Sequence, residues 1–330
     1  MSSTITSVSS ADEGSRATGA RRLTGGGPRR RRGLTPRWLP WALFAPALFV
    51  LGGLLIYPLY RVVVLSLQDF GLRELVTGET TWVGLDNFRE LLSDPLFWKV
   101  ALPNTVGFAA VNVFLTVALG TLVALLLARV GSWTRGVLTS AIMVAWAMPA
   151  VSGTYVWVLL FDPRSGMVMR LLSSLGLVDP ETTNWFTERL PFYAIATLNV
   201  VHHGFPFVAV TVLAALMTVP REILEAAEID GAGAWNRFWY IVVPLLKPVF
   251  AVVTILSTIW DFKVFVQIFL MPGGDGVNRD VLNLATWSYV TAFGQGNRFG
   301  LGSAIAVSLT LVLIAITAFY IRFMFREEEL

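Results

Sequence analysis

The sequence predicts an all-α integral membrane protein with six transmembrane helices and a cytoplasmic helix–turn–helix loop. Three observations lead to this fold class. Hydrophobic residues make up 55% of the 330 positions and charged residues only 14%, whereas a soluble domain carries roughly 25% charged residues. Six apolar runs are long enough to cross a bilayer. A polar, helix-forming insert separates the fourth run from the fifth.

Each apolar run provides the roughly 20 residues that a helix needs to cross a hydrocarbon core about 30 Å thick. The runs are approximately Leu39–Leu67, Leu102–Ala128, Val137–Leu160, Phe192–Met217, Val249–Leu270 and Leu301–Phe323. Backbone groups in lipid must find hydrogen-bond partners within their own segment, so the runs are predicted to be helices. Pro46, Pro58, Pro149 and Pro206 lie inside or near the ends of runs, where we expect kinks that neighbouring helices support.

Basic residues predict the orientation of these helices. Eight arginines precede the first run: Arg16, Arg21, Arg22, Arg29, Arg30, Arg31, Arg32 and Arg37. Under the positive-inside rule this tail stays in the cytoplasm, and six crossings return the C-terminus to the same side. Both termini are therefore expected to be cytoplasmic. Nucleic-acid binding is the alternative use of such a cluster, and we do not expect nucleic acid as a partner.

The predicted organisation follows from these spans. Residues 1–37 form a disordered cytoplasmic tail, 38–68 the first transmembrane helix and 69–101 an extracytoplasmic segment. Residues 102–323 form the transmembrane core, which contains the cytoplasmic loop 218–248, and residues 324–330 form a second cytoplasmic tail. The last outside segment, Met271–Gly300, opens with Pro-Gly-Gly-Asp-Gly, which is a strong turn signal.

The insert has the pattern of a short helix, a tight turn and a second helix. Thr218 and Pro220 mark the expected start, because threonine can cap a helix and proline is tolerated in its first turn. Gly231 stands just past the first helix, where a left-handed backbone is needed. The second helix is predicted to carry an apolar face formed by Trp235, Phe238, Trp239 and Val242. Pro244 and Pro248 are expected to end it before the next span.

The same insert carries a longer motif. It reads Glu225-Ala226-Ala227, three residues, Gly231, nine residues, and then Ile241-Val242-Val243-Pro244. This motif resembles the EAA loop of the permease subunits of binding-protein-dependent ABC importers. The resemblance runs from about residue 43 to residue 325, includes residues 82–88, 94–98 and 260–265, and is closest to six-span sugar permeases of the maltose and glycerol-phosphate type. This chain departs from the family at Val243, where leucine is usual, and at residues 272–276, where a Gly-Gly-Gly-Pro run is common.

The resemblance implies a complex in a bacterial inner membrane. This chain would pair with a second, homologous permease subunit as a heterodimer, bind two ATPase subunits and receive solute from an extracytoplasmic solute-binding protein. The positions implied for ATPase coupling are Glu225, Ala226, Ala227, Asp230, Gly231, Ala232, Phe238 and Pro244. ATP and Mg²⁺ would be bound by the ATPase subunits, with no cofactor or metal on this chain.

The sequence agrees with nucleotide binding on separate ATPase subunits. The chain has no G-x-x-x-x-G-K-[ST] phosphate-binding loop, and its only lysines are Lys99, Lys247 and Lys263. It also has no cysteine, which excludes disulfides, thiol catalysis and cysteine-based metal sites. An intramembrane enzyme is not expected either, because the sequence has neither H-E-x-x-H nor paired membrane aspartates.

Five residues are the candidates for a substrate pathway: Asn199, His203, Asp261, Lys263 and Trp260. An ionised group at a helix centre costs roughly 2.5–3.5 kcal/mol on insertion scales, so it needs a partner or a wet cavity. The polar residues either line a pathway for a hydroxylated solute or form hydrogen bonds between helices without touching a ligand. Asp261 and Lys263 lie two positions apart, so both cannot squarely face one cavity.

The leading interpretation is a permease subunit of an importer for a di- or oligosaccharide, because a polar, largely uncharged lining with aromatic rings suits sugars. A glycerol-3-phosphate or polyol importer is the alternative. An anionic solute would require an arginine in the pathway, and Arg61 is the only candidate, for which snorkelling towards the membrane surface is an equal explanation. A non-transporting membrane anchor or sensor is a more distant alternative.

Overall fold

The computed structural model describes residues 38–273, 278–294 and 296–325. The chain divides into two units, residues 1–52 and 53–330, which are described separately. In the first unit, the described residues form one apolar helix, α1 (Leu39–Leu51), with Pro46 inside it. The π-helical turn η1 (Gly52–Ile56) then crosses the boundary between the units. The predicted tail 1–37 and residues 326–330 of the predicted C-terminal tail lie outside the described residues.

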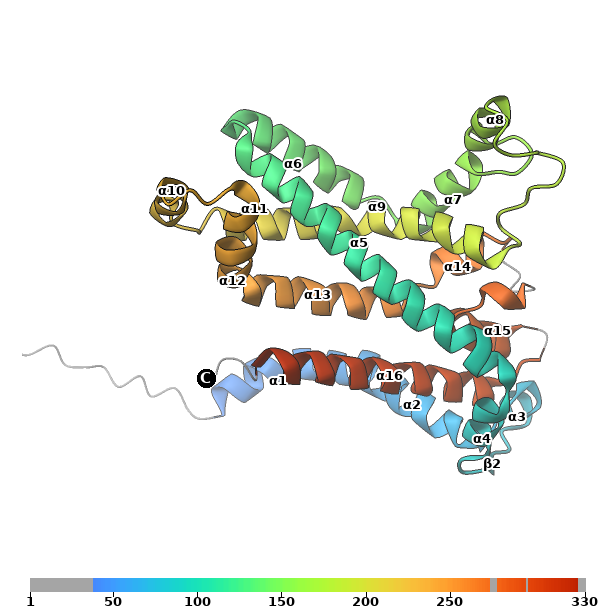
Figure 1. Cartoon of the computed structure of the whole chain (residues 1–330). Coiled ribbons are helices and arrows are strands. Elements are labelled where there is room, and N and C mark those ends of the chain that lie inside the picture. Colours follow the sequence, from blue (N-terminus) through green and yellow to red (C-terminus); the bar gives the residue numbers. More distant parts are fainter. Residues whose placement is uncertain (1–37, 274–277, 295, 326–330) are drawn as a thin grey trace, which may run out of the picture. The chain divides into compact units, whose positions relative to one another are not determined.

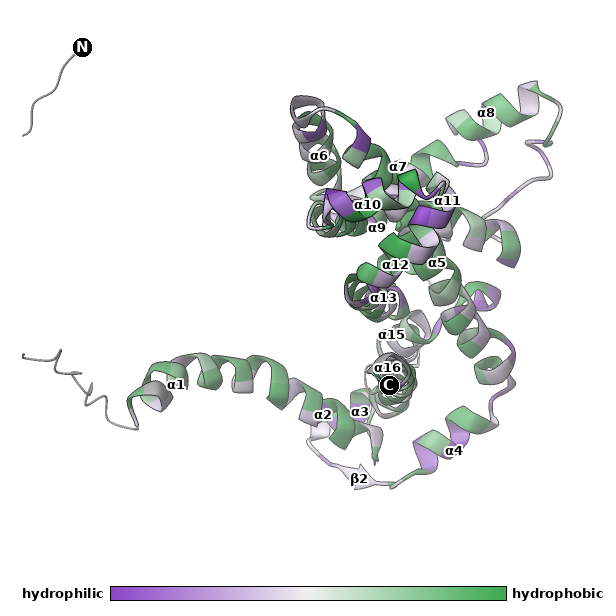
Figure 2. Ribbon diagram, turned by 60° about the vertical axis from the view of Figure 1, so that its left-hand side comes forward, coloured by the Kyte–Doolittle hydropathy of each residue, from purple (hydrophilic) through white to green (hydrophobic). Residues whose placement is uncertain are grey.

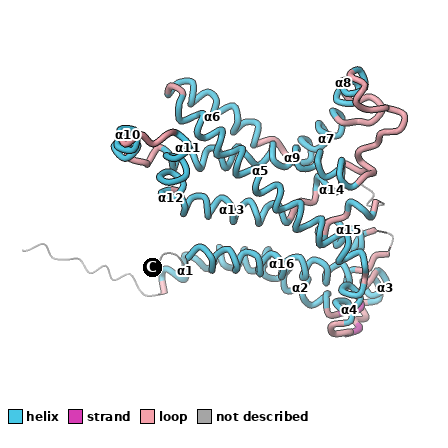
Figure 3. Tube along the Cα trace, viewed as in Figure 1, coloured by secondary structure: helices cyan, strands magenta, loops and turns pink. Residues whose placement is uncertain are grey.

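The second unit is built from helices joined by loops (Figures 1 and 3). Its longer helices are α2 (Tyr57–Ser66), α5 (Leu102–Arg129), α9 (Arg189–Leu216), α13 (Lys247–Phe262) and α16 (Phe299–Phe325). Five helical stretches of the described chain are long and apolar enough to cross a membrane, or six if one bent pair is a single span. These five are Trp41–Ser66, Phe97–Arg129, Arg189–Leu216, Lys247–Leu270 and Phe299–Arg322. The predicted all-α membrane fold is confirmed.

The third apolar run is not the single helix that its length predicts. It forms α6 (Ser132–Trp146) and α7 (Ala150–Leu160), which meet at an angle of 90°. Pro149 immediately precedes α7 and has an extended ψ of 132°. Proline lacks an N–H and disfavours helical backbone in the residue before it, so the helix cannot continue through Met148. The expected kink is therefore a complete break.

The fifth run is also interrupted. The helix α13 ends at Phe262, and α14 (Val266–Leu270) begins after a short non-helical stretch. A break inside a membrane leaves backbone carbonyls without helical partners. Asn283 supplies one partner, because its Nδ2 donates to the Val264 carbonyl at 2.7 Å. This interruption places Lys263 at the end of α13 instead of inside a longer helix.

Close packing of α5 against α9 forms the centre of the second unit. A Cβ added at Gly120 of α5 would lie 2.6 Å from Cβ of Val208, and one added at Gly204 of α9 would lie 3.1 Å from Cγ2 of Thr116. Small residues at such crossings let helix backbones approach closely, which is how helices gain contact in lipid. Beside this crossing, Phe192 and Ile195 of α9 join Phe108 of α5 in a buried cluster.

The shorter elements lie at one end of the second unit, opposite the end that contains residues 218–248 (Figure 1). These are β1 (Gln68–Asp69), α3 (Leu72–Thr77), β2 (Thr81–Trp82), α4 (Asp86–Ser93), η2 (Phe97–Ala101), α8 (Met167–Ser174), η4 (Arg279–Val281) and α15 (Leu284–Phe293). The two strands are antiparallel, and Gln68 faces Trp82 while Asp69 faces Thr81. We refer to this region as the α4 end.

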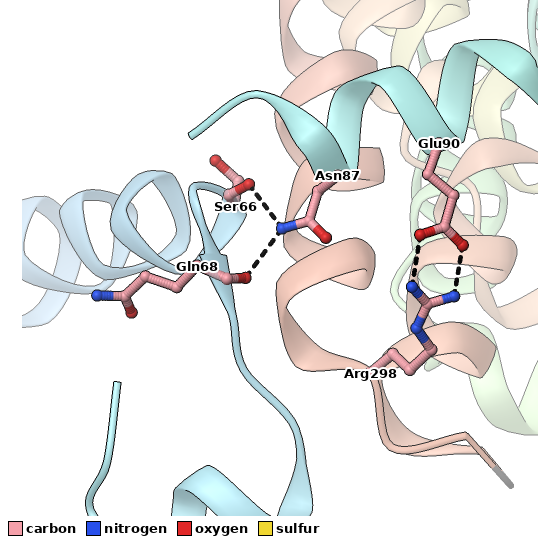
Figure 4. A network of polar contacts seen from close by, with 5 residues as sticks. All are labelled: Ser66, Gln68, Asn87, Glu90 and Arg298. Carbon is pink, nitrogen blue, oxygen red and sulfur yellow. Dashed lines mark hydrogen bonds and ion pairs between the residues drawn. The ribbon is translucent and has the colours of Figure 1, made fainter. Parts of the chain in front are cut away.

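Polar contacts hold the α4 end together (Figure 4). Nδ2 of the buried Asn87 donates to the carbonyls of Ser66 and Gln68, at 3.0 and 2.9 Å. Both guanidinium Nη atoms of Arg298 reach the Glu90 carboxylate at 2.5 Å. These contacts join α4 to the end of α2 and to the start of α16, although Glu90 and Arg298 are 208 positions apart.

The Glu90–Arg298 pair predicts a modest dependence of stability on pH. The hydrogen bond from Arg298 lowers the pKa of Glu90 below its ordinary value of 4.5. The stabilisation is therefore fully present above pH 4.5 and is lost as the pH falls through the lowered pKa. Both side chains are 49% exposed, so it is expected to amount to less than about 1 kcal/mol.

Denaturation in detergent, at about pH 6 and at successively lower pH, measures this effect. Glu90→Gln is expected to lose stability at about pH 6 and to show a weaker pH dependence than the parent. Glu181→Gln, in the loop between α8 and α9, is the matched control. Equal pH dependence of the parent and Glu90→Gln would contradict the prediction.

Side chains of two spans fasten the segment that leads into α15. Asn104 Nδ2 of α5 donates to the carbonyls of Asp280 and Leu282, at 3.0 and 2.8 Å, and Tyr193 of α9 donates to the Val281 carbonyl. The helix α15 itself was not anticipated within the outside segment Met271–Gly300. Its signal is present in the sequence, because Asn283 and Thr286 form a capping box at its start.

Candidate functional site

The polar insert forms a helix–turn–helix at the end of the second unit away from α4 (Figure 1). It consists of α10 (Arg221–Ile229), α11 (Ala234–Arg237), η3 (Phe238–Val242) and α12 (Val243–Leu245). Hydrophilic residues gather on α10 and α11 (Figure 2). Pro220 immediately precedes α10, in agreement with the predicted start. Thr218 does not cap α10: Pro220 is the N-cap residue, without a side-chain cap, and the Thr218 hydroxyl donates to the Ala215 carbonyl of the preceding helix.

Gly231 makes the turn between the two helices. Its φ of +81° lies in the left-handed region, which confirms the backbone predicted for this position. The Gly231 N–H donates to the Glu228 carbonyl at 3.0 Å, and the Ala232 N–H donates to the Ala227 carbonyl at 2.9 Å. This pair of bonds is the Schellman motif, which satisfies carbonyls at the end of α10 and fixes the direction in which the chain leaves it.

The second helix of the insert continues one residue past Pro244, to Leu245. The π-helical turn η3 precedes Pro244, and the Val243 N–H donates to the Phe238 carbonyl. Pro244 then occupies the first turn of α12, where its missing N–H costs little. On the predicted apolar face Val242 is buried and Phe238 is partly buried, but Trp235 is 72% exposed.

The outer surface of α10 presents most of the predicted coupling residues. Glu225, Ala226, Asp230 and Gly231 are exposed, while Ala227 and Ala232 are partly buried. Ile229 is 87% exposed beside them, although the sequence reasoning did not single it out. No residue of α10 is buried in the structure, so helical spacing alone does not distinguish Ile229 from the other apolar positions of this helix. The surface therefore combines small, acidic and apolar side chains.

Arg135 of α6 forms hydrogen bonds that hold the turn between α5 and α6. Its Nε donates to the Leu127 carbonyl at 3.0 Å and its Nη2 donates to the Val130 carbonyl at 3.0 Å, so it caps the end of α5. Its Nη1 lies 3.7 Å from Sδ of Met217, the residue that ends α9 before the insert. The same guanidinium thus contacts the end of α5 and the end of α9, immediately before the insert.

The predicted pathway residues occupy several places. Asn199 and His203 of α9 line a cavity of about 70 Å³ with Met148 and Trp157 at the α6–α7 break. Asn199 is buried, and its Nδ2 has no hydrogen-bond partner within the described chain. The lining of this cavity is mostly apolar, but Asn199 and the histidines give a water molecule or a ligand hydroxyl group hydrogen-bond partners there.

Trp260 connects α13 to α9 and α6 through aromatic contacts. Its ring centroid lies 5.0 Å from that of Phe207, which in turn stacks on Trp146 at 6.2 Å. Lys263 is exposed, whereas Asp261 is buried and its Oδ2 has no partner among the described residues. Asn199, His203 and Trp260 therefore belong to the region around α6, α7 and α9. Asp261 does not line the cavity at the α6–α7 break.

A larger groove of about 900 Å³ runs along α5. Its walls include Phe114 and Arg129 of α5, Trp239 of η3, Phe250 of α13 and Tyr320 of α16. Among the predicted site residues only Phe238 lines it. Within the described chain no group of three or more histidine, aspartate or glutamate side chains is arranged to hold a metal ion.

Residues 117–326, which include the helix–turn–helix, match the family model described as "Binding-protein-dependent transport system inner membrane component". The chain belongs to this family. It is thus an integral membrane permease and a transporter subunit, not an enzyme, and ATP hydrolysis lies on a separate chain.

Curated relatives of this permease include subunits of sugar transport systems. It is 37% identical over 306 residues to the diacetylchitobiose uptake system permease protein DasB of Streptomyces coelicolor, covering 93% of this chain and 92% of the relative. It is 31% identical over 288 residues to the trehalose transport system permease protein SugA of Mycobacterium tuberculosis, covering 87% and 88%.

The fold of this permease also matches solved structures. A bacterial ABC transporter involved in the import of the acidic polysaccharide alginate aligns with a TM-score of 0.73 and 21% identity, over 88% of this chain and 96% of that chain. A second structure of a bacterial alginate ABC transporter, in complex with an alginate pentasaccharide-bound periplasmic protein, aligns with a TM-score of 0.71 and 20% identity. These matches extend the likeness to most of the chain.

Proposed function

We propose that this permease forms half of the translocation pathway of an ATP-driven importer for a di- or oligosaccharide. The observation that carries the proposal is the helix–turn–helix 218–248, which presents an exposed surface on a turn fixed by Gly231. We propose that Glu225, Ala226, Asp230 and Gly231 contact an ATPase subunit, with the partly buried alanines allowing close approach. Phe238 begins η3 and Pro244 lies in the first turn of α12, and we propose that both shape the second helix that follows the turn.

The distribution of charge supports an orientation. Arg129, Arg135, Arg221, Arg237 and Lys247 all lie in or beside the insert and the α5–α6 turn. The positive-inside rule assigns this side to the cytoplasm, where the ATPases bind ATP and Mg²⁺. Both termini then lie in the cytoplasm, and the α4 end faces the solute-binding protein outside. The periplasmic protein bound to the related alginate transporter supports such a partner.

The groove along α5 supports pairing with a second permease subunit. From Val106 to Arg129 its wall extends roughly 35 Å along the helix, which is about the thickness of the bilayer core. Exposed Phe114, Leu122 and Trp239 would face lipid in an isolated chain. An apolar surface of this length fits a transmembrane helix of the homologous partner, because a helix about 10 Å wide needs a long, continuous contact.

The aromatic and polar side chains around the α6–α7 break support a sugar as the solute. Trp146, Phe207 and Trp260 offer ring faces to the apolar faces of sugar rings, and Asn199 and His203 offer hydrogen bonds to hydroxyls. Lys263 lies exposed just past the end of α13, beside Trp260 in sequence. The relatives are named for diacetylchitobiose and trehalose, which are both disaccharides. The aromatic rings together with the uncharged Asn199 suit a neutral, hydroxylated solute better than a phosphate.

The proposed mechanism moves the insert as ATP binds. Closure of the ATPases shifts α10–α12, and the spans rock between inward-open and outward-open arrangements. Driving such a gate from 1:99 to 99:1 needs about 5.5 kcal/mol of differential interaction. Nucleotide binding at two ATPases, transmitted through two helix–turn–helix contacts, is the proposed source.

Ala226→Arg tests the contact. Ala226 is exposed, so the variant is expected to fold, but the long charged side chain would keep the ATPase away from α10. Purification from the native membrane in mild detergent is expected to recover the second permease and much less ATPase, at least tenfold below the parent. Val76→Arg, at an 80% exposed position of α3, adds the same charge at the α4 end and serves as the control.

Full recovery of ATPase with Ala226→Arg would refute the docking assignment. Absence of any ATPase with the parent chain would instead favour an anchor or sensor. The solute class is tested on the co-purified solute-binding protein, with disaccharides, glycerol-3-phosphate and polyols as separate ligands. Binding of glycerol-3-phosphate alone would overturn the saccharide assignment.

A further inference from the structure

Glu228 and Arg237 join the two helices of the insert across its turn. Nη1 of Arg237 donates to Oε2 of Glu228 at 2.6 Å. The Arg237 side chain is 25% exposed and that of Glu228 is 68% exposed, so the pair lies at the edge of the insert. In the described chain no other side-chain hydrogen bond or ion pair links α10 to α11.

Two glycines make this link important. Gly231 and Gly233 flank Ala232 between the helices, and a Cβ added at either would meet nothing within 4 Å. The space where a side chain would stand is therefore open at both positions, and glycine restricts backbone rotation less than any other residue. The Schellman bonds hold Gly231 and Ala232 to α10, but Gly233 lies beyond them and is the N-cap residue of α11. The ion pair joins α10 to α11 across Gly233, where the backbone can rotate.

We propose that Glu228 and Arg237 are a positioning pair that makes α10 and α11 move as one rigid body when an ATPase pushes on α10. This inference rests on the proposed function of the insert. Without the pair, a displacement of α10 by the ATPase would rotate the backbone at Gly233. The displacement would then not be transmitted to η3, α12 and α13. Neither residue needs to touch the ATPase, and their role is to keep the docking surface aligned with the fifth span.

The size of the effect makes the pair testable without unfolding the protein. An exposed ion pair of this kind changes a conformational equilibrium by at most about fivefold. Removing it is therefore expected to leave the membrane fold intact and to alter the relative movement of α10 and α11. The chain has no cysteine, so two spin labels can be attached at introduced cysteines without a competing thiol on this chain.

The experiment measures the distance between spin labels at Glu222→Cys and Asn236→Cys by pulsed electron paramagnetic resonance. Both positions are exposed, and neither belongs to the docking surface or the ion pair. The full chain is used, co-purified with its partner permease and ATPases, before and after addition of ATP. The parent is expected to give one narrow distance distribution that ATP leaves unchanged.

Glu228→Gln and Arg237→Gln are each expected to broaden the distribution at least twofold and to let ATP shift its mean. Arg237→Lys keeps the charge and is expected to stay narrow. Arg221→Gln removes an exposed arginine from the first turn of α10 and is the matched control, also expected to stay narrow.

Equal widths in all variants would overturn the proposal, and so would Arg237→Lys as broad as Arg237→Gln, since packing of the arginine would then be the cause. Failure of the proposed function is distinguishable. In that case the ATPase does not co-purify even with the parent, whereas the widths measured without ATP still decide whether the pair braces the turn.

Discussion

Replacing Gly231 with valine is expected to weaken ATPase binding by roughly tenfold to a hundredfold and to abolish uptake. Gly231 has a φ of +81°, which a β-branched residue adopts only with strain of about 1–3 kcal/mol. Each 1.4 kcal/mol corresponds to a factor of ten in an equilibrium constant, and the docking conformation would be depleted accordingly. A Cβ at this position has open space around it, so the whole effect comes from the backbone.

Titration of purified ATPase onto the detergent-solubilised permeases measures the affinity. Gly231→Asn is the matched control, because asparagine tolerates the left-handed region, and it is expected to bind nearly as well as the parent. A valine variant that binds as tightly as the asparagine variant would show that the turn does not need this backbone. It would also remove the main physical reason for placing the coupling surface at α10.

Replacing Gly120 with alanine is expected to destabilise the membrane fold by about 1–3 kcal/mol. The added Cβ would lie 2.6 Å from Cβ and 2.7 Å from Cγ1 of Val208, and 3.0 Å from the Phe205 carbonyl oxygen. Two of these contacts are too short for any real Cβ, and one neighbour is backbone, so α5 and α9 must move apart. This crossing lies at the buried centre of the second unit, so the substitution weakens the packing of both helices.

Reversible unfolding in mixed detergent micelles measures the difference in free energy. Gly107→Ala is the control on the same helix, because nothing lies within 4 Å of its added Cβ. That variant is expected to be neutral or slightly more stable, since alanine favours a helix over glycine by about 0.5–1 kcal/mol. Equal stabilities of the two variants would mean that α5 and α9 do not approach closely enough at Gly120 for an added Cβ to clash with Val208.

The sequence by itself determined the elements that depend on local pattern and on lipid. Apolar runs long enough to cross a bilayer must become helices, because backbone groups in lipid have no other partners. Gly231 was identifiable because a helix that ends in a tight turn needs a left-handed residue there. The helix–turn–helix and the family also followed from residues 225–244, since short-range spacing carries both.

Only the tertiary structure decided the features that depend on distant or broken segments. Pro149 marks an interruption, but nothing in its neighbourhood specifies the 90° angle between α6 and α7. Arg298 pairs with Glu90, which lies 208 positions away in the sequence. Asn283 donates a hydrogen bond to the Val264 carbonyl at the α13–α14 break. The same holds for Glu228 and Arg237, whose contact depends on how the chain leaves Gly231. Local periodicity determines which residues share a helix face, whereas the partner of that face is chosen by packing of the whole chain.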